Sequence, residues 1–187
     1  PSVRSRDYCC WSTRRPGWRS TGLYAPPGGV IAVRPDPRRG VPGLLLRIGA
    51  HTDDLWHLPA WKRWPDIAAA TPVWSPRTRF ANPFGGLVYL DVPDGPGRGT
   101  MSVEVAGAVE APWFVRGRTS ARDWHRRIRT LPAPWAELEG RRIILTLPSS
   151  AVRSLDDPET LLAFWDRAVE AQDALAGWGP AETRRPE

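Results

Sequence analysis

The chain has 187 residues, of which 41% are hydrophobic, so it can form one domain with a hydrophobic core or one part of a larger domain, but not a two-domain enzyme. No run of eighteen apolar residues occurs, which excludes a transmembrane helix within this sequence. The formal net charge of +6 comes from arginines that are scattered instead of clustered, so a nucleic-acid-binding protein, which would be retained on heparin or DNA, is not favoured.

The first 19 residues are rich in Arg, Ser, Pro and Gly without any period, and we predict a tail or linker there. They include the adjacent Cys9 and Cys10, which match neither a CxxC metal pattern nor a favourable disulfide geometry. Two short apolar runs, Gly28–Pro35 and Gly43–Gly49, predict strands. The proline-rich residues between them predict a hairpin-like connection.

Residues 50–83 form a long segment that is dense in Trp and Pro and shows no clear period. A segment of this kind inside a compact domain is unusual and is often functional. Strands resume at Gly85–Pro93, Gly99–Val109 and Ala111–Gly117. In the second of these, apolar residues at every second position predict one buried and one exposed face.

Two helices are marked by their end signals. Ser120, with Asp123 three residues later, predicts the start of the first helix. Asp157 and Pro158 predict the start of the last helix, and Gly177 predicts its end. On this last helix we expect one stripe to pack on the sheet: Leu161, Trp165, Ala168, Gln172 and Leu175.

Between these helices, Pro132–Gly140 predicts a proline-bounded turn, Arg141–Pro148 the last strand, and residues 148–155 a short helix. The order of many strands followed by helices indicates an α+β fold, with a predominantly antiparallel, β-sandwich-like sheet followed by C-terminal helices.

The segment HTDDLWH holds two of the three histidines, His51 and His57, around Asp53 and Asp54. Their six-residue spacing does not match HExxH, in which two histidines four apart on a helix hold zinc. A hydrogen-bonded loop is therefore favoured over a metal site. The chain also lacks GxSxG, so we assign no catalytic and no metal-binding residue.

Tryptophans of the long segment allow two interpretations, which the sequence leaves open. Exposed indole rings stack on sugars, so Trp56, Trp61, Trp64 and Trp74 together would make a glycan-binding surface. Alternatively, these large apolar side chains pack in the core.

Six blocks occur in the order of one known family: Ser20–Gly28, Arg47–Pro65, Ala81–Pro93, Gly107–Gly117, Pro132–Gly140 and Ile144–Asp166. Through them the chain resembles the peptidase M60 family, the enhancin-like zinc metallopeptidases, which include the channel-associated factors of animals. The resemblance extends from about Trp18 to Gly177.

The resemblance implies that residues 20–178 are the N-terminal β-rich part of an M60-like peptidase domain, between a tail of residues 1–19 and a truncated C-terminal tail of residues 179–187. The family's HExxH signature lies C-terminal to these blocks. Zinc is therefore expected in the full-length family domain and no cofactor in this chain. Because the family cleaves mucin-like glycoproteins, a glycan or glycoprotein partner outside the cell or at its surface is implied, with no membrane or nucleic-acid partner. The composition, typical of a GC-rich genome, favours a bacterial source.

Asn82, Gly85 and Gly86 precede a predicted strand, where glycines permit close backbone approach. An exposed edge at Gly85–Leu90 would hold an extended substrate by main-chain hydrogen bonds, although a tight turn with core packing is the alternative. Our substrate-facing candidates are Trp56, His57, Trp61, Asn82, Gly85 and Gly86. Two functions remain: the N-terminal portion of an M60-like zinc metallopeptidase, inactive alone, or a non-catalytic glycan-binding β-sandwich module.

Overall fold

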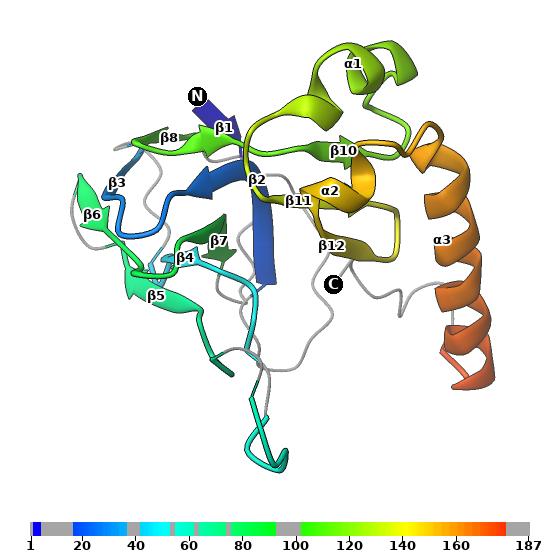
Figure 1. Cartoon of the computed structure of the whole chain (residues 1–187), viewed down its shortest axis with the longest axis horizontal. Helices are drawn as coiled ribbons and strands as arrows, with labels where there is room; N and C mark the ends of the chain where they lie inside the picture. Colours follow the sequence, from blue (N-terminus) through cyan, green and yellow to red (C-terminus); the bar gives the residue numbers. More distant parts are fainter. Residues whose placement is uncertain are drawn as a thin grey trace. The chain divides into compact units, whose positions relative to one another are not determined.

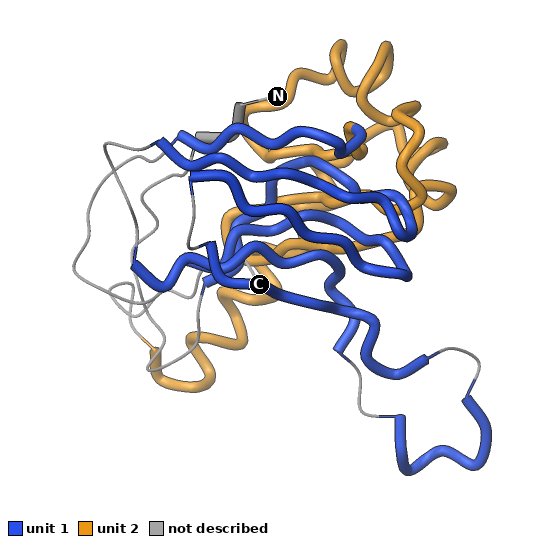
Figure 2. The backbone as a smooth tube through the Cα atoms, turned by 90° about the vertical axis from the view of Figure 1, so that its left-hand side faces the viewer, with its two compact units in different colours: residues 1–7, 15–109 blue, residues 8–14, 110–187 orange. Residues whose placement is uncertain are grey.

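The computed structural model describes residues 2–4, 17–36, 42–52, 55–61, 64–73, 76–92 and 102–178. The chain divides into two compact units, coloured separately in Figure 2. Unit 1 consists of Pro1–Asp7 and Arg15–Val109, and unit 2 of Tyr8–Arg14 and Glu110–Glu187. Each unit has a hydrophobic core of its own.

Two sheets make up unit 1 (Figure 1). The first has the strand order β5 (Ala69–Pro72), β4 (Leu45–Ile48), β7 (Gly86–Val92), β2 (Gly17–Ala25), β9 (Val109–Glu110). The second has the order β1 (Ser2–Arg4), β8 (Ser102–Ala106), β3 (Ile31–Pro35), β6 (Thr78–Phe80). Antiparallel pairing joins β7 to both β2 and β4, and β3 to both β6 and β8.

The core of unit 1 is formed by side chains from both sheets. Leu46 and Leu90 of the first sheet and Val33 and Val103 of the second belong to one buried cluster. Side chains alternate along each strand, so residues at every second position reach this cluster and their neighbours face the other way. In β8 the alternation is the expected one, with Val103 and Val105 buried between exposed residues. This arrangement is a β-sandwich.

Unit 2 combines a three-stranded sheet with helices. Strand β10 (Trp113–Val115) pairs in parallel with β11 (Trp135–Glu139), which pairs antiparallel with β12 (Ile144–Pro148). The helices are α1 (Ala121–Arg126), the short 3₁₀ turn η1 (Ile128–Thr130), α2 (Ser149–Val152) and α3 (Pro158–Leu175). Its core is built around the fully buried Trp124, whose ring meets Phe114 edge-on at 5.5 Å. No helix in the described part of the chain is long and apolar enough to cross a membrane.

The fold class predicted from the sequence is confirmed, and so are both helix starts. Ser120 caps α1 by accepting from the Asp123 amide at 3.0 Å. Asp157 caps α3 by accepting from the Thr160 amide at 2.9 Å, and Gly177 follows the helix with a φ of 73°.

The predicted turn at Pro132–Gly140 is wrong, because residues 135–139 form the central strand β11. The sequence WAELE consists largely of good helix formers, which does not indicate a strand. Its polar residues Glu137 and Glu139 are moreover buried, at 2% and 5% exposure, so the strand lacks the usual alternation of buried and exposed positions. The structure shows that Ala136 and Leu138 face the core, whereas the two glutamates lie on the opposite face of the strand.

The predicted buried stripe of α3 is only partly right: Leu161 packs against the core of unit 2, but the rest of the stripe does not form the buried face. Leu175 is 91% exposed and Trp165 38%, whereas the buried residues of the helix are Pro158, Leu162, Asp166 and Asp173. The helix is rotated from the expected orientation because two carboxylates, and not only apolar side chains, face the protein. Hydrophobic periodicity alone does not detect such a face.

Three expectations for unit 1 need correction as well. Strands β3 and β4 lie in different sheets, so the segment between them is not a hairpin connection; its residues 37–41 lie outside the described residues. The long segment 50–83 contains two short strands, β5 and β6, that the sequence did not reveal. Within the first 19 residues, expected as a tail, residues 2–4 and 17–19 are strand. Cys9 and Cys10 lie outside the described residues.

Candidate functional site

The connection between β4 and β5, residues 49–68, is here called the tryptophan loop. It projects from its sheet in both Figure 1 and Figure 2. Its two ends are joined, because the Ile67 amide donates to the His51 carbonyl oxygen at 3.1 Å and Thr52 forms a β-bridge with Asp66. The loop therefore has a closed neck, and the residues beyond the neck form its tip.

Asn82, in the turn before β7, fastens this neck. Its amide Nδ2 donates to the carbonyl oxygen of Ile48 at 3.0 Å and to that of Ile67 at 2.7 Å, while its Oδ1 accepts from the Phe84 amide at 3.0 Å. Both amide protons and the carbonyl oxygen are thus used inside the protein, and Asn82 is only 1% exposed. The side chain ties together the end of β4, the end of the loop and the turn.

Three tryptophans gather in the tip of the loop. The rings of Trp56 and Trp61 meet edge-on with centroids 4.6 Å apart, and those of Trp61 and Trp64 with centroids 6.3 Å apart. Their exposed fractions are 70%, 38% and 59%, so they do not form part of either core. We call this group the tryptophan cluster. Trp74, the fourth tryptophan of the predicted surface, lies outside the described residues.

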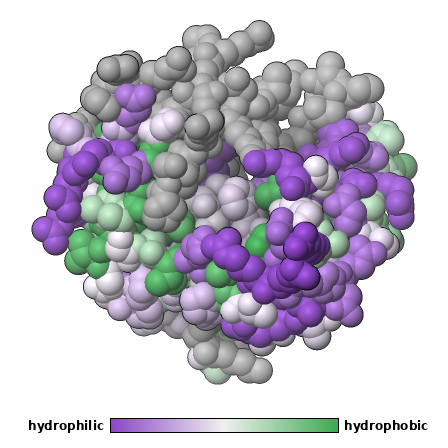
Figure 3. All heavy atoms as spheres, turned by 90° about the horizontal axis from the view of Figure 1, so that it is seen from above, coloured by the Kyte–Doolittle hydropathy of each residue, from purple (hydrophilic) through white to green (hydrophobic). Residues whose placement is uncertain are grey.

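The tryptophan cluster is one of several exposed apolar groups. In the space-filling view of Figure 3, hydrophobic residues reach the surface in small groups between hydrophilic ones. Large exposed aromatic side chains that touch one another are characteristic of binding surfaces, because indole rings provide apolar area together with an N–H donor. The tryptophan cluster can therefore stack on an apolar face of a ligand.

The histidines of HTDDLWH do not assemble a metal centre with the described residues. His51 is half-buried in the neck and His57 is exposed in the tip, and Asp53 and Asp54 lie outside the described residues. In the part of the chain that the structure describes, no three His, Cys, Asp or Glu side chains lie close enough to hold a metal ion. The described residues of this segment, His51 and His57 among them, therefore do not fit a zinc site.

Gly85 and Gly86 are required by close backbone contacts. A Cβ atom on Gly85 would lie 2.6 Å from the Ala25 carbonyl oxygen, and one on Gly86 would lie 2.6 Å from the Gly49 nitrogen and Cα. Their φ angles of 66° and 146° also disfavour any other residue. Of the two interpretations offered for this pair, the structure therefore supports the tight turn with close packing.

The expected substrate-binding strand edge at Gly85–Leu90 is wrong. Strand β7 lies between β4 and β2 and is hydrogen-bonded to both, so neither of its edges can take up another chain. Asn82, Gly85 and Gly86 act on the neck of the tryptophan loop, while Trp56, His57 and Trp61 are the candidates whose side chains reach solvent.

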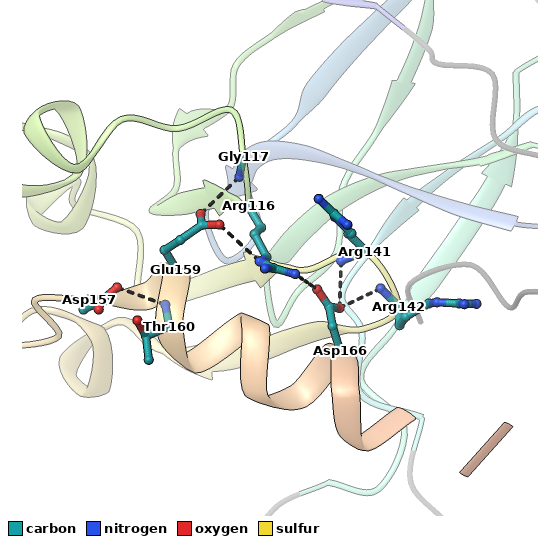
Figure 4. A network of polar contacts seen from close by, with 8 residues as sticks. All are labelled: Arg116, Gly117, Arg141, Arg142, Asp157, Glu159, Thr160 and Asp166. Carbon is teal, nitrogen blue, oxygen red and sulfur yellow. Dashed lines mark hydrogen bonds and ion pairs between the residues drawn. The ribbon is translucent and has the colours of Figure 1, made fainter. Parts of the chain in front are cut away.

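Two polar groups in the structure were not identified from the sequence. In unit 2, the Asp166 carboxylate of α3 accepts from the Arg116 guanidinium at 2.6 Å and from the successive amides of Arg141 and Arg142 at 2.8 Å each (Figure 4). A Cβ at position 140 would lie 2.6 Å from Asp166 Oδ1, which explains the glycine there. The backbone turn is thus a carboxylate-binding nest.

Arg116 connects this carboxylate to the start of α3. Its Nε donates to Glu159 at 3.1 Å, and the same glutamate accepts from the Gly117 amide (Figure 4). The hydrogen bond that Arg116 donates to Asp166, together with the nearby negative charges of Asp166 and Glu159, raises the pKa of Arg116, so it stays protonated. The network holds α3 in position and is structural, since Asp166 is 2% exposed.

In unit 1 the corresponding group is the pair of Arg47 and Asp91. Arg47 donates to Asp91 Oδ2 from Nε at 3.0 Å and from Nη2 at 2.9 Å, and its guanidinium lies 4.3 Å from the Trp18 ring centre. Burial raises the pKa of Asp91, and the hydrogen bond and charge of Arg47 only partly oppose this. The alternating strand pattern contained no signal for this pair, since Asp91 occupies a position in β7 that faces away from the apolar cluster.

Solved structures show in which proteins a fold of this kind occurs. A structure from Bacillus anthracis of unknown function matches 90% of this chain with a TM-score of 0.70 at 19% identity, over 33% of its own length. The catalytic module of the metalloprotease ZmpA from Clostridium perfringens matches 84% with a TM-score of 0.64 at 14% identity, over 35% of its length. IMPa from Pseudomonas aeruginosa in complex with an O-glycopeptide matches 91% with a TM-score of 0.61 at 18% identity, over 20% of its length. The fold is therefore one that occurs in metallopeptidases.

The sequence itself gives the family. Residues 4–106 match the N-terminal domain of M60-like peptidases, and residues 107–187 match peptidase M60, enhancin and enhancin-like. The chain belongs to the M60-like peptidases, as the resemblance predicted. The boundary between the two matches falls near residue 109, where unit 1 ends.

Curated relatives come from animals. The TRPM8 channel-associated factor homolog of Xenopus laevis is 43% identical over 91% of this chain, and the human TRPM8 channel-associated factor 1 is 38% identical over 91%. The chain spans about a fifth of the length of these relatives, 19% and 18%. Their vertebrate origin contradicts the expectation of a bacterial source, because amino-acid composition reports base composition and not lineage.

Proposed function

We propose that this chain is part of an M60-like zinc metallopeptidase acting on glycoproteins, and that Trp56, His57 and Trp61 face the substrate. The observation that carries the proposal is the exposed contact of Trp56 with Trp61 at 4.6 Å on a loop with a fastened neck. Membership of the M60-like peptidases supports the peptidase class. The O-glycopeptide bound to IMPa, a protein of similar fold, supports the substrate class.

Each group has a distinct part in this proposal. The indole faces of the tryptophan cluster stack on sugar rings, whose C–H-rich faces are apolar, and the exposed imidazole of His57 hydrogen-bonds to hydroxyl groups. Asn82, Gly85 and Gly86 contribute indirectly, because they hold the neck that orients the tip. Zinc belongs to the complete family domain, and none of the described residues is assigned a catalytic step.

Binding of a mucin-type O-glycopeptide, measured by isothermal titration calorimetry, tests the role of the tryptophans. Trp61→Ala is expected to weaken binding about tenfold or more, since truncation of a contacting Trp commonly costs at least about 1.4 kcal/mol. Trp165→Ala on α3 is the matched control, because Trp165 has the same exposed fraction of 38% as Trp61 and lies outside the loop. Equal affinities of the two variants would count against the proposal, as would absence of binding by the wild type.

A non-catalytic glycan-binding module is the second candidate, since the tryptophan cluster alone would serve it equally well. The two functions differ in whether a zinc motif accompanies these residues. Sequencing the transcript beyond the codon for Glu187 separates them. The peptidase proposal expects HExxH followed by a glutamate ligand, whereas a reading frame without that motif leaves only the binding module.

A further inference from the structure

The segment from Arg116 to Arg129 in unit 2 contains six arginines, and the structure divides them into two groups. Arg116, Arg127 and Arg129 form ion pairs with carboxylates from other segments: Asp166 and Glu159, Glu110, and Asp156 respectively. Arg118, Arg122 and Arg126 are exposed, and none of them forms an ion pair within the described residues. Half of the positive charge of this segment is therefore uncompensated.

The three uncompensated arginines follow one another at intervals of four residues. Arg122 and Arg126 lie on one face of α1, one turn apart, and Arg118 lies in the turn that leads into the helix. The only carboxylate on α1, Asp123, is occupied with the cap, where it accepts from the Ser120 hydroxyl at 2.7 Å. Asp123 keeps its negative charge in the cap, but within the described residues it forms no ion pair with any of the three arginines.

The surroundings of these arginines restrict the kind of anion that fits. Trp124, the aromatic residue of α1, and Phe114, whose ring it contacts, are buried at 0% and 2% exposure, so neither ring can stack with a nucleobase. None of the large exposed hydrophobic side chains in the described residues lies between positions 110 and 163, so nothing here inserts into a lipid layer. Helix α1 has six residues, which is too short to fill a groove of DNA.

We propose that Arg118, Arg122 and Arg126 form a docking surface for a sulfated polysaccharide. Guanidinium groups present several N–H donors in a planar fork and are weakly hydrated, which suits the oxygens of repeated sulfate groups. A flexible linear polyanion needs neither stacking nor insertion and can follow charges spaced one helical turn apart. This surface is separate in sequence from the tryptophan loop and does not depend on the proposed peptidase function.

Binding of a heparin decasaccharide to the full chain, measured by calorimetry at several salt concentrations, tests the proposal. The variant Arg122→Ser/Arg126→Ser is expected to bind at least about tenfold more weakly and to lower the slope of log K against log salt by about two. The control Arg79→Ser/Arg167→Ser removes the same charge from exposed positions on β6 and α3, and its affinity is expected to stay within about threefold of the wild type.

Three outcomes would overturn the docking surface. Equal losses in the two double variants would mean that net charge alone causes retention. Unchanged binding to desulfated heparin would remove sulfate as the recognised group. Tighter binding to duplex DNA or to vesicles of anionic lipid than to heparin would identify another partner. Trp61→Ala is expected to leave heparin binding intact, so this test and that of the proposed function can fail separately.

Discussion

Replacing Asp166 by asparagine removes the charge that fixes helix α3 to its sheet. The carboxylate is 2% exposed and accepts three hydrogen bonds, from Arg116 at 2.6 Å and from two successive backbone amides at 2.8 Å. In the variant an amide group faces these donors, and the buried end of Arg116 loses its partner. Removing one member of a buried ion pair costs on the order of 3–5 kcal/mol. Because Arg116 keeps Glu159 and is 21% exposed, we expect the lower end, about 3 kcal/mol.

The assay is urea unfolding followed by circular dichroism, with thermal unfolding as a second measurement. A loss of about 3 kcal/mol corresponds to a fall in Tm of roughly 6–12 °C for a chain of this size. Glu159→Gln is the control, since that carboxylate is 49% exposed and its replacement is expected to cost less than about 1 kcal/mol. If Asp166→Asn is no more destabilising than Glu159→Gln, then Asp166 does not anchor α3 and the reasoning fails.

Three more predictions concern unit 1. Gly86→Ala places a Cβ 2.6 Å from backbone atoms, whereas the Cβ of the control variant Gly28→Ala meets nothing within 4 Å. The control is expected to lower the free energy of unfolding by roughly 1–2 kcal/mol, and Gly86→Ala by more. A smaller loss for Gly86→Ala would contradict the close packing. Asn82→Ala leaves two carbonyl oxygens without their donor, so limited proteolysis should cut the tryptophan loop faster than in the wild type, and unchanged rates would show that Asn82 does not fasten the neck. Burial raises the pKa of Asp91 above its ordinary value of 3.8, so the contribution of Asp91 to the free energy of unfolding falls as the pH rises from 3.8 through the raised pKa. In urea titrations across that pH window, the wild type should therefore lose stability relative to Asp91→Asn. A gain in stability relative to the variant would contradict this.

Features with a local cause could be predicted from the sequence. The caps at Ser120 and Asp157 depend on residues three positions apart, and the alternation in β8 depends on neighbours within one strand. The family could be predicted because its blocks are contiguous. Its two matched regions cover residues 4–187, including the first part of the chain where no periodic pattern was visible.

Features that depend on distant partners could not be predicted. The orientation of α3 is set by Asp166, whose hydrogen-bond partners lie 24 or more positions away in the sequence. Because a charged residue occupies the buried face, the distribution of apolar residues along the helix does not indicate which face is buried. For the candidate site, the sequence named Asn82, Gly85 and Gly86 as substrate-facing residues, whereas Asn82 is buried and the two glycines pack against backbone at the neck of the loop. Their contacts with Ile48, Ile67 and Gly49 become visible only when three segments are brought together.

The central claim is that the tip of the tryptophan loop contacts a glycoprotein substrate. Nuclear magnetic resonance tests it most directly, because each of the eleven tryptophans has one indole N–H signal that can be assigned with single Trp→Phe variants. On titration with a mucin-type O-glycopeptide, we predict shifts of the signals of Trp56, Trp61 and Trp64, with the signal of the buried Trp124 unchanged. Shifts confined to tryptophans outside the loop, or no shifts at saturating glycopeptide, would contradict it.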